Sequence, residues 1–187
     1  MREARLQWRE RTKGIDPARF RFMDESGAKT NMVRLYGRCP QGERLRSKAP
    51  AGHWQTTTMI AVAGLEGVAA PFALDGAVDA ESFLVYVEHI LVPTLRGGEI
   101  VVLDNLACHK HPRVRELIES ARAEVWYLPP YSPDFNPIEE MWSKIKHILR
   151  SIAARTFEGL VEAIGTALKR VSVEDLLGWF THCGYMT

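Results

Sequence analysis

Two aspartates lie where apolar stretches of the sequence end, and a glutamate lies at the beginning of an expected helix. Asp24 follows the alternating stretch RFRFM, Asp104 follows the apolar run IVVL, and Glu139 begins a segment with a helical apolar stripe. No Lys or Arg lies beside Asp104 in VVLDNLAC, so a carboxylate buried there needs another positive partner. Carboxylate oxygens are the ligands that Mg2+ prefers, and three carboxylates gathered without a cation would raise one another's pKa values. The pattern therefore favours a site for a divalent cation.

The pair Glu139-Glu140 offers two carboxylates in the first turn of an expected helix. Glu140 has Lys144 four residues later, which is the favourable order for a surface ion pair. Glu139 has Ser143 at the same offset and is therefore freer to face a metal ion. The alternative is that Glu139 only completes a capping box with Asn136.

A mixed α/β fold must position these acids. Period-2 alternation predicts a strand at 19–24, and β-branched or apolar runs predict others at about 32–38, 55–63, 100–104 and 125–128. Helical spacing predicts helices at about 79–92, 112–121, 137–152, 157–170 and 173–182. The stretch 128–137 contains four prolines, so we expect a stiff, extended loop there. The order of these elements predicts a mixed sheet flanked by helices.

Three blocks of the sequence carry a more specific signal: FMDES, VVLDNLACHK and YLPPYSPDFNPIEEMW, in that order. They resemble the signature blocks of the mariner-type DDE transposase superfamily, in its bacterial insertion-sequence branch. Thirty-four residues separate Asp104 from Glu139, a spacing typical of that group. The resemblance covers about residues 19–153 and implies an RNase H-like fold, a mixed five-stranded sheet flanked by helices. It places Asp24 and Asp104 on the first and fourth strands and Glu139 on a later helix.

The resemblance also implies an activity. A catalytic domain of this kind binds two Mg2+ or Mn2+ ions through Asp24, Asp104 and Glu139 and carries out DNA strand cleavage and strand transfer at insertion-sequence ends. One ion activates water and later a DNA 3'-hydroxyl, while the other stabilises the departing oxygen. Asn105 and His109 match family positions after the second aspartate. We expect them to hold the metal ligands in place or to contact phosphate, with simple loop structure as the alternative.

The basic residues are unevenly distributed. Residues 1–65 hold thirteen Lys or Arg against six Asp or Glu, whereas residues 66–128 hold five against ten. A basic first third suits a polyanion such as DNA, although a solvated surface explains the same surplus. The residues that we expect to contact the DNA backbone flank the second and third expected strands or share the Glu139 side of its helix: Arg34, Arg38, Arg44, Arg46, Lys48, His53, Lys146 and Arg150.

Length and composition bound the class of protein. A chain of 187 residues fits one compact domain with its own core, and no apolar run reaches the roughly 18 residues of a membrane span. The charged N-terminus does not resemble a signal peptide, so we expect a cytoplasmic protein. Cys39, Cys108 and Cys183 are odd in number and widely spaced, which favours free thiols. Trp54 is expected in the core, with stacking on a DNA base as the alternative.

Residues 1–18 are interpreted as a helix and linker from a missing DNA-binding region, and residues 19–187 as the RNase H-like DDE catalytic domain. Members of this family carry helix-turn-helix modules upstream, so the chain is either a fragment or the downstream product of two reading frames. The expected partners are DNA, that upstream region and a second copy in a homodimeric active complex, with no membrane. Two alternatives stay open: another RNase H-like nuclease, and a catalytically silent transposase relic that acts as a DNA-binding or dimerising module.

Overall fold

The centre of the molecule is a five-stranded mixed sheet with the strand order β3-β2-β1-β4-β5. This computed structural model describes residues 2–51 and 54–186. Neighbouring strands are antiparallel from β3 to β1, whereas β4 runs parallel to both β1 and β5. The mixed sheet expected from the sequence is confirmed. The strands are β1 (Phe20–Lys29), β2 (Thr56–Gly64), β3 (Gly67–Asp75), β4 (Ile100–Leu103) and β5 (Glu124–Tyr127).

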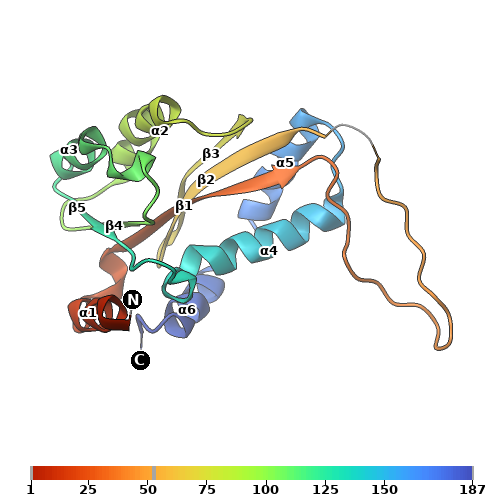
Figure 1. Ribbon diagram of the computed structural model, residues 1–187, viewed down its shortest axis with the longest axis horizontal. Coiled ribbons are helices and arrows are strands. Elements are labelled where there is room, and N and C mark those ends of the chain that lie inside the picture. The colour runs from red at the N-terminus through yellow and green to blue at the C-terminus, as the bar shows by residue number, and fades with distance from the viewer. Residues whose placement is uncertain (1, 52–53, 187) are drawn as a thin grey trace.

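Helices cover both faces of this sheet (Figure 1). One apolar cluster joins the sheet to α1, α4, α5 and α6 through Trp8, Trp142, Ile164 and Phe180. A second cluster joins the opposite face to α2 and α3. The helices are α1 (Arg2–Thr12), α2 (Ala80–Tyr86), which continues as a π-helical turn (Val87–Leu91), α3 (Pro112–Ser120), α4 (Pro137–Ile152), α5 (Phe157–Leu168) and α6 (Val173–His182).

Adjacent residues of β1 face opposite sides of the sheet, as strand geometry requires. Phe22 packs in the cluster with α4, whereas Met23 packs in the cluster with α2 and α3. Asp24 follows the alternation of Phe22 and therefore lies on the α4 side. Glu25 follows the alternation of Met23 and lies on the other side, so the two neighbouring acids have different surroundings.

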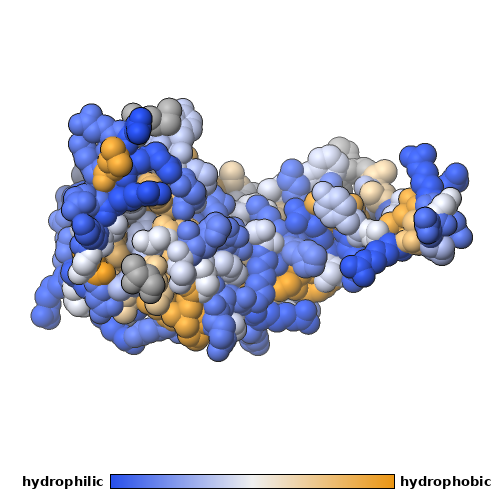
Figure 2. Space-filling model, turned by 90° about the horizontal axis from the view of Figure 1, so that it is seen from below, coloured by the Kyte–Doolittle hydropathy of each residue, from blue (hydrophilic) through white to orange (hydrophobic). Residues whose placement is uncertain are grey.

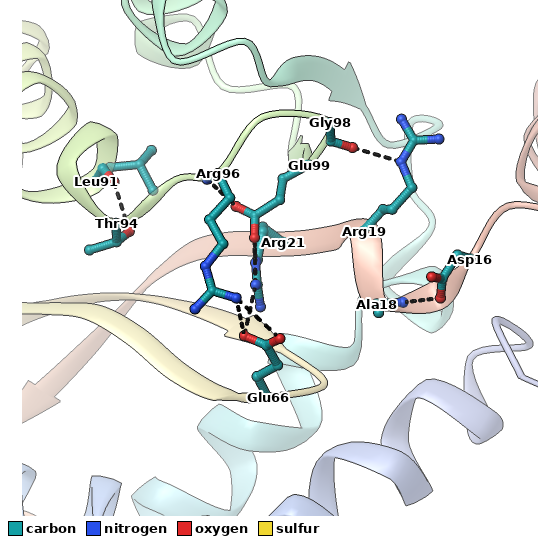
Figure 3. A network of polar contacts seen from close by, with 10 residues as sticks. All are labelled: Asp16, Ala18, Arg19, Arg21, Glu66, Leu91, Thr94, Arg96, Gly98 and Glu99. Atoms are coloured by element: carbon teal, nitrogen blue, oxygen red, sulfur yellow. Dashed lines mark hydrogen bonds and ion pairs between the residues drawn. The ribbon is translucent and has the colours of Figure 1, made fainter.

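A buried ion pair fixes β1 against β4 (Figure 3). The Nη2 and Nε atoms of Arg21 lie 2.5 and 2.9 Å from Oε1 of Glu99, and the two side chains are only 10% and 8% exposed. Oε2 of Glu99 accepts from the backbone N–H of Arg96 at 3.0 Å. Glu66, in the β2–β3 turn, pairs with both Arg21 and Arg96. The network connects the residue before β4 and the β2–β3 turn to β1.

The structure differs from the sequence predictions at three places in the first half of the chain. The segment 32–38 is not a strand but belongs to an extended arm, residues 30–51, that projects from the body of the molecule (Figure 1). Its apolar residues Leu35 and Tyr36 are 65% and 90% exposed, because no neighbouring strand or helix covers them. The strand that sequence patterns missed is β3, an edge strand that contains Pro71 and an irregular register and therefore lacks clean alternation. Trp54 is 50% exposed and does not lie in the core.

Other expectations hold. The helices expected from about residue 79 onward are confirmed, and Asp79 caps α2 by accepting from the backbone N–H of Ser82 at 2.8 Å. Cys39, Cys108 and Cys183 are free thiols. Within the described ranges, no helix is long and apolar enough to cross a membrane.

Candidate active site

β1 and β4 bring the two aspartates together. The parallel pairing aligns Phe20 with Ile100 and Phe22 with Val102. Continuing this register by two residues aligns Asp24 with Asp104, which directly follows β4. Asp24 does not end its strand, as the sequence suggested, because β1 continues beyond it through antiparallel pairing with β2. Asp24 thus lies at the point where β1 loses its parallel neighbour.

The third acid comes from the first turn of α4. The proline-rich stretch before it is a loop as expected, with one short 3-10 turn at Pro133–Phe135. Asn136 takes the N-cap position and Pro137 the first helical position, but the Asn136 side chain makes no capping hydrogen bond. A capping box between Asn136 and Glu139 is therefore absent. Seven apolar residues bury one side of α4 against the sheet, which fixes the direction in which its first turn points.

All three acids line one open pocket of about 510 Å³. Among the residues that the structure describes, neither Glu140 nor any Lys or Arg lines this pocket. Glu139 therefore shares the pocket with the two aspartates. The pocket is lined by Asp24, Asp104, Asn105, Leu106, Leu128, Pro129, Pro130, Tyr131, Ser132, Pro133, Asn136 and Glu139.

The predicted ion pair between Glu140 and Lys144 is wrong. Lys144 does not pair with Glu140; its ammonium group contacts Asp175 at the beginning of α6 instead. Oε1 of Glu140 lies 3.9 Å from Nε2 of His182. Tertiary packing between α4 and α6 thus replaces the local pair that helical spacing suggested.

Electrostatic repulsion is concentrated at Asp24. Burial is the main cause that raises the pKa of Asp24 to about 8, and the negative charges of Glu139 and Glu25 raise it further. Asp104 adds to the same effect. The carboxylates are therefore close enough to influence one another, and no basic side chain from the described part of the chain lines the pocket to compensate them. A bound cation would provide the missing charge.

Asp104 has a different environment because His109 holds it. Its Oδ1 atom lies 2.6 Å from Nδ1 of His109 and accepts from the backbone N–H of Leu106 at 2.8 Å. Burial alone would raise the pKa of Asp104, but these hydrogen bonds hold it below its usual value. His109 is completely buried, and its other ring nitrogen, Nε2, lies 2.9 Å from Oε1 of Glu25. Burial opposes the charged imidazole, yet the two carboxylates raise the pKa of His109 to about 10.

The donor set suits a divalent cation, although the three acids line the pocket without forming one tight cluster. Among the residues that the structure describes, no three His, Cys, Asp or Glu side chains lie together as a ready metal-binding group. The lining of the pocket offers carboxylate oxygens, which hard cations such as Mg2+ and Mn2+ prefer, and no competing base. Asn105 connects the two sides of the pocket, since its Nδ2 donates to the backbone oxygen of Leu128 at 2.6 Å.

The residues expected to contact DNA lie outside this pocket. Those of the arm are all exposed, with Glu43 as the only acid among residues 30–51. In the space-filling view, the arm stands away from the body and carries many hydrophilic residues (Figure 2). Lys146 and Arg150 are partly exposed on α4 and form no ion pair within the described ranges. His53 lies outside the described residues. The exposed arm residues are Arg34, Arg38, Arg44, Arg46 and Lys48.

Comparison with known proteins identifies the family. The sequence model of the DDE superfamily endonucleases matches residues 19–161. No curated protein shows a significant match to the sequence. Solved structures share the fold at low identity. The pre-cleavage Mos1 transpososome has a TM-score of 0.76 at 17% identity, over 97% of this chain and 58% of that chain. The Mos1 mariner paired-end complex with Mn has a TM-score of 0.76 at 18% identity, over 96% and 56%.

The catalytic domain of Mos1 mariner transposase gives a TM-score of 0.70 at 16% identity, over 98% of this chain and 86% of that chain. The chain thus spans little more than half of the longer Mos1 chains. The agreement confirms an RNase H-like fold with a mixed five-stranded sheet flanked by helices. Together with the family match over most of the sequence, it shows that the chain belongs to the DDE superfamily endonucleases.

Proposed function

We propose that this chain is the catalytic domain of a transposase that cleaves DNA and transfers the cut strand at insertion-sequence ends. The observation that carries the proposal is the common pocket of Asp24, Asp104 and Glu139, to which residues 2–51 and 54–186 contribute no basic side chain. The DDE endonuclease family match and the fold shared with Mos1 support it. The intact acids give no support to a catalytically silent relic.

We propose Asp24, Asp104 and Glu139 as the residues that hold two Mg2+ or Mn2+ ions. Solved Mos1 complexes with Mg and with Mn support the choice of metal. When bound, such ions make a hydroxyl group a better nucleophile and stabilise the departing oxygen of a phosphodiester. The protein supplies the geometry: β1 and β4 align the two aspartates, and the buried face of α4 fixes Glu139. Because Asp24 has a raised pKa, it gives up a proton when a cation binds near neutral pH.

DNA is the proposed substrate, and the basic residues outside the pocket are the proposed backbone contacts. Arg34, Arg38, Arg44, Arg46 and Lys48 place positive charge along the arm, and Lys146 and Arg150 place it along α4. Lys and Arg side chains of this kind neutralise phosphates without reading sequence. We assign Asn105 and His109 to the support of the Asp104 loop, because Asn105 fastens it to Leu128 and His109 bonds Asp104 itself.

We further propose that residues 1–18 link the catalytic domain, residues 19–187, to an upstream helix-turn-helix region, and that the active complex is a homodimer. The Mos1 chain in its pre-cleavage transpososome is longer than the part that this chain matches, and Mos1 also forms paired-end complexes with transposon-end DNA. In this chain α1 packs on the catalytic domain, since Trp8 is only 4% exposed.

A nicking and joining assay tests the proposal. Supercoiled plasmid and a short duplex with a free 3'-hydroxyl are incubated with the protein, in the presence of Mn2+ or of a chelator. We expect metal-dependent nicking and joining that Asp104→Asn abolishes. Activity that persists in the chelator, or that Asp104→Asn leaves at the level of the unmodified protein, would contradict the proposal.

A further inference from the structure

Glu25 is a buried acid that faces away from the pocket. It neighbours Asp24 on β1, but its side chain lies on the opposite face of the sheet and is 13% exposed. Its Oε1 atom contacts His109, whereas its Oε2 atom is buried and has no hydrogen-bond partner among the described residues. A carboxylate that is removed from water and only half satisfied costs stability. This cost makes a purely structural reason for Glu25 weak.

The imidazole between Glu25 and Asp104 is held at both ring nitrogens and packs against Phe83. Both ring nitrogens face carboxylate oxygens, Nδ1 at 2.6 Å from Asp104 and Nε2 at 2.9 Å from Glu25. The Phe83 ring lies against it, with 4.6 Å between the ring centroids. The hydroxyl of Tyr127 donates to the backbone oxygen of His109 at 2.9 Å. These contacts therefore hold the His109 ring in one orientation. Because Nδ1 of the ring contacts Oδ1 of Asp104, they also orient the Asp104 side chain.

We propose that Glu25 is a positioning residue, which orients Asp104 for metal binding through the buried His109. Oδ1 of Asp104 is engaged by His109 and by the backbone N–H of Leu106, whereas Oδ2 has no hydrogen bond from any described residue. The arrangement thus reserves one oxygen of Asp104 for a ligand. Hydrogen bonds that orient a ligating carboxylate in this way typically change metal affinity by about 10- to 100-fold. The inference rests on the proposed function, because it takes Asp104 as a metal ligand.

Three substitutions of Glu25 distinguish the effect of side-chain length from the effect of charge. Glu25→Gln keeps the length and an acceptor oxygen for Nε2–H of His109, Glu25→Asp keeps the charge but shortens the side chain, and Glu25→Leu removes the acceptor. Mn2+ affinity is measured by calorimetry without DNA. We expect Glu25→Gln to stay within about threefold of the unmodified protein and Glu25→Leu to bind about 10- to 100-fold more weakly. Glu25→Asp should lose as much Mn2+ affinity as Glu25→Leu. If Glu25→Leu does not fold, Glu25→Asp takes its place in the experiment.

A spectroscopic readout distinguishes positioning from stability. In the metal-free protein, 1H–15N spectra of the imidazole should show both ring N–H groups of His109. These signals should persist in Glu25→Gln, and the Nε2–H signal should disappear by exchange with water in Glu25→Leu. The matched control is Glu99→Gln, which alters another carboxylate with little exposure, 8% against 13% for Glu25, in the ion pair with Arg21 and outside the lining of the pocket. It should lower the melting temperature without changing Mn2+ affinity or the His109 signals.

The Mn2+ affinities of the variants distinguish a failure of the role of Glu25 from a failure of the proposed function. Mn2+ affinity that is unchanged in Glu25→Leu or Glu25→Asp, while Asp104→Asn abolishes binding, overturns the role of Glu25 alone. Equal losses in Glu25→Gln and Glu25→Leu also overturn it, because charge rather than the hydrogen bond would then decide affinity. If Asp104→Asn itself leaves binding unchanged, the proposed function fails first, and the role of Glu25 fails with it.

Discussion

Arg5 and Asp134 are 129 residues apart in the sequence and form a two-pronged ion pair, with Nη1–Oδ1 and Nη2–Oδ2 distances of 2.8 and 2.6 Å. Nη1 of Arg5 also donates to the hydroxyl of Ser132 at 3.0 Å. A second connection runs from Nε1 of Trp8 to the hydroxyl of Tyr185, which in turn donates to the backbone oxygen of Phe135. α1 is thus fastened to the loop that precedes Glu139, and this loop lines the candidate active site.

Arg5→Gln should therefore loosen the loop more than it destabilises the protein. The Arg5 hydrogen bond holds the pKa of Asp134 below its usual value. The pair thus contributes stability above the unfolded pKa of about 3.9, and the contribution is lost as the pH falls through the lower folded pKa. Hydrogen exchange of residues 130–136 should accelerate in Arg5→Gln at pH 7, and the difference from the unmodified protein should shrink in acid. Arg2→Gln is the control, and equal exchange in both variants would refute the connection.

The Arg21–Glu99 pair predicts a large loss of stability. Glu99→Ala leaves the Arg21 guanidinium buried with only the more exposed Glu66 as a partner. Removing one partner of a buried pair costs about 3–5 kcal/mol. The control Glu119→Ala breaks an exposed pair with Arg115 on α3 and should cost about 0.5 kcal/mol or less. Urea unfolding measures both, and losses of similar size would show that the buried pair does not fix β1 against β4.

Asp24 predicts an unusual dependence of stability on pH in the metal-free protein. Its folded pKa of about 8 exceeds the unfolded value of about 3.9, so the unfolded state ionises first as the pH rises. The Asp24 contribution to stability therefore falls between these values and is fully unfavourable above pH 8. Asp24→Asn should melt above the unmodified protein at pH 8 in a chelator, and near it at pH 4. A melting temperature of Asp24→Asn that is lower at pH 8 would contradict the repulsion.

The arm predicts the salt dependence of DNA binding. Each neutralised phosphate contributes about 0.9 to the slope of log affinity against log salt concentration. The double variant Arg44→Gln/Arg46→Gln should lower this slope by about 2, and should weaken binding equally for different DNA sequences. The control is Arg113→Gln/Arg115→Gln, which removes two exposed charges from α3. If the slope changes only in the control variant, the arm does not contact the DNA backbone.

The sequence was most informative where one segment determines its own structure. The apolar run before Asp104, the stripe along α4 and the prolines before it need no distant partner to be recognised, and the structure has all three. Sequence patterns failed where pairing with a distant segment determines the secondary structure. Residues 32–38 have strand-like composition but no neighbouring strand, and β3 is a strand only because β2 pairs with it.

The same limit applies at the site. Lys144 was expected to pair locally and instead contacts Asp175, which lies 31 residues away. Glu25 was overlooked because its contact with His109 spans 84 residues, a separation that no local pattern reveals. Strand alternation offered the only signal: the second acid of the pair at 24–25 must face the other side of the sheet, where a buried carboxylate needs a partner.

The most direct test of the central claim compares the two adjacent glutamates of α4. Glu139 lines the pocket with Asp24 and Asp104, whereas Glu140 does not, although both are exposed carboxylates in the same helical turn. Mn2+ binding is measured by calorimetry for Glu139→Gln and Glu140→Gln, together with nicking of plasmid DNA. We predict that Glu139→Gln loses Mn2+ affinity at least tenfold and nicking by orders of magnitude, while Glu140→Gln retains both. Unchanged binding and nicking in Glu139→Gln, or a loss confined to Glu140→Gln, would contradict the account.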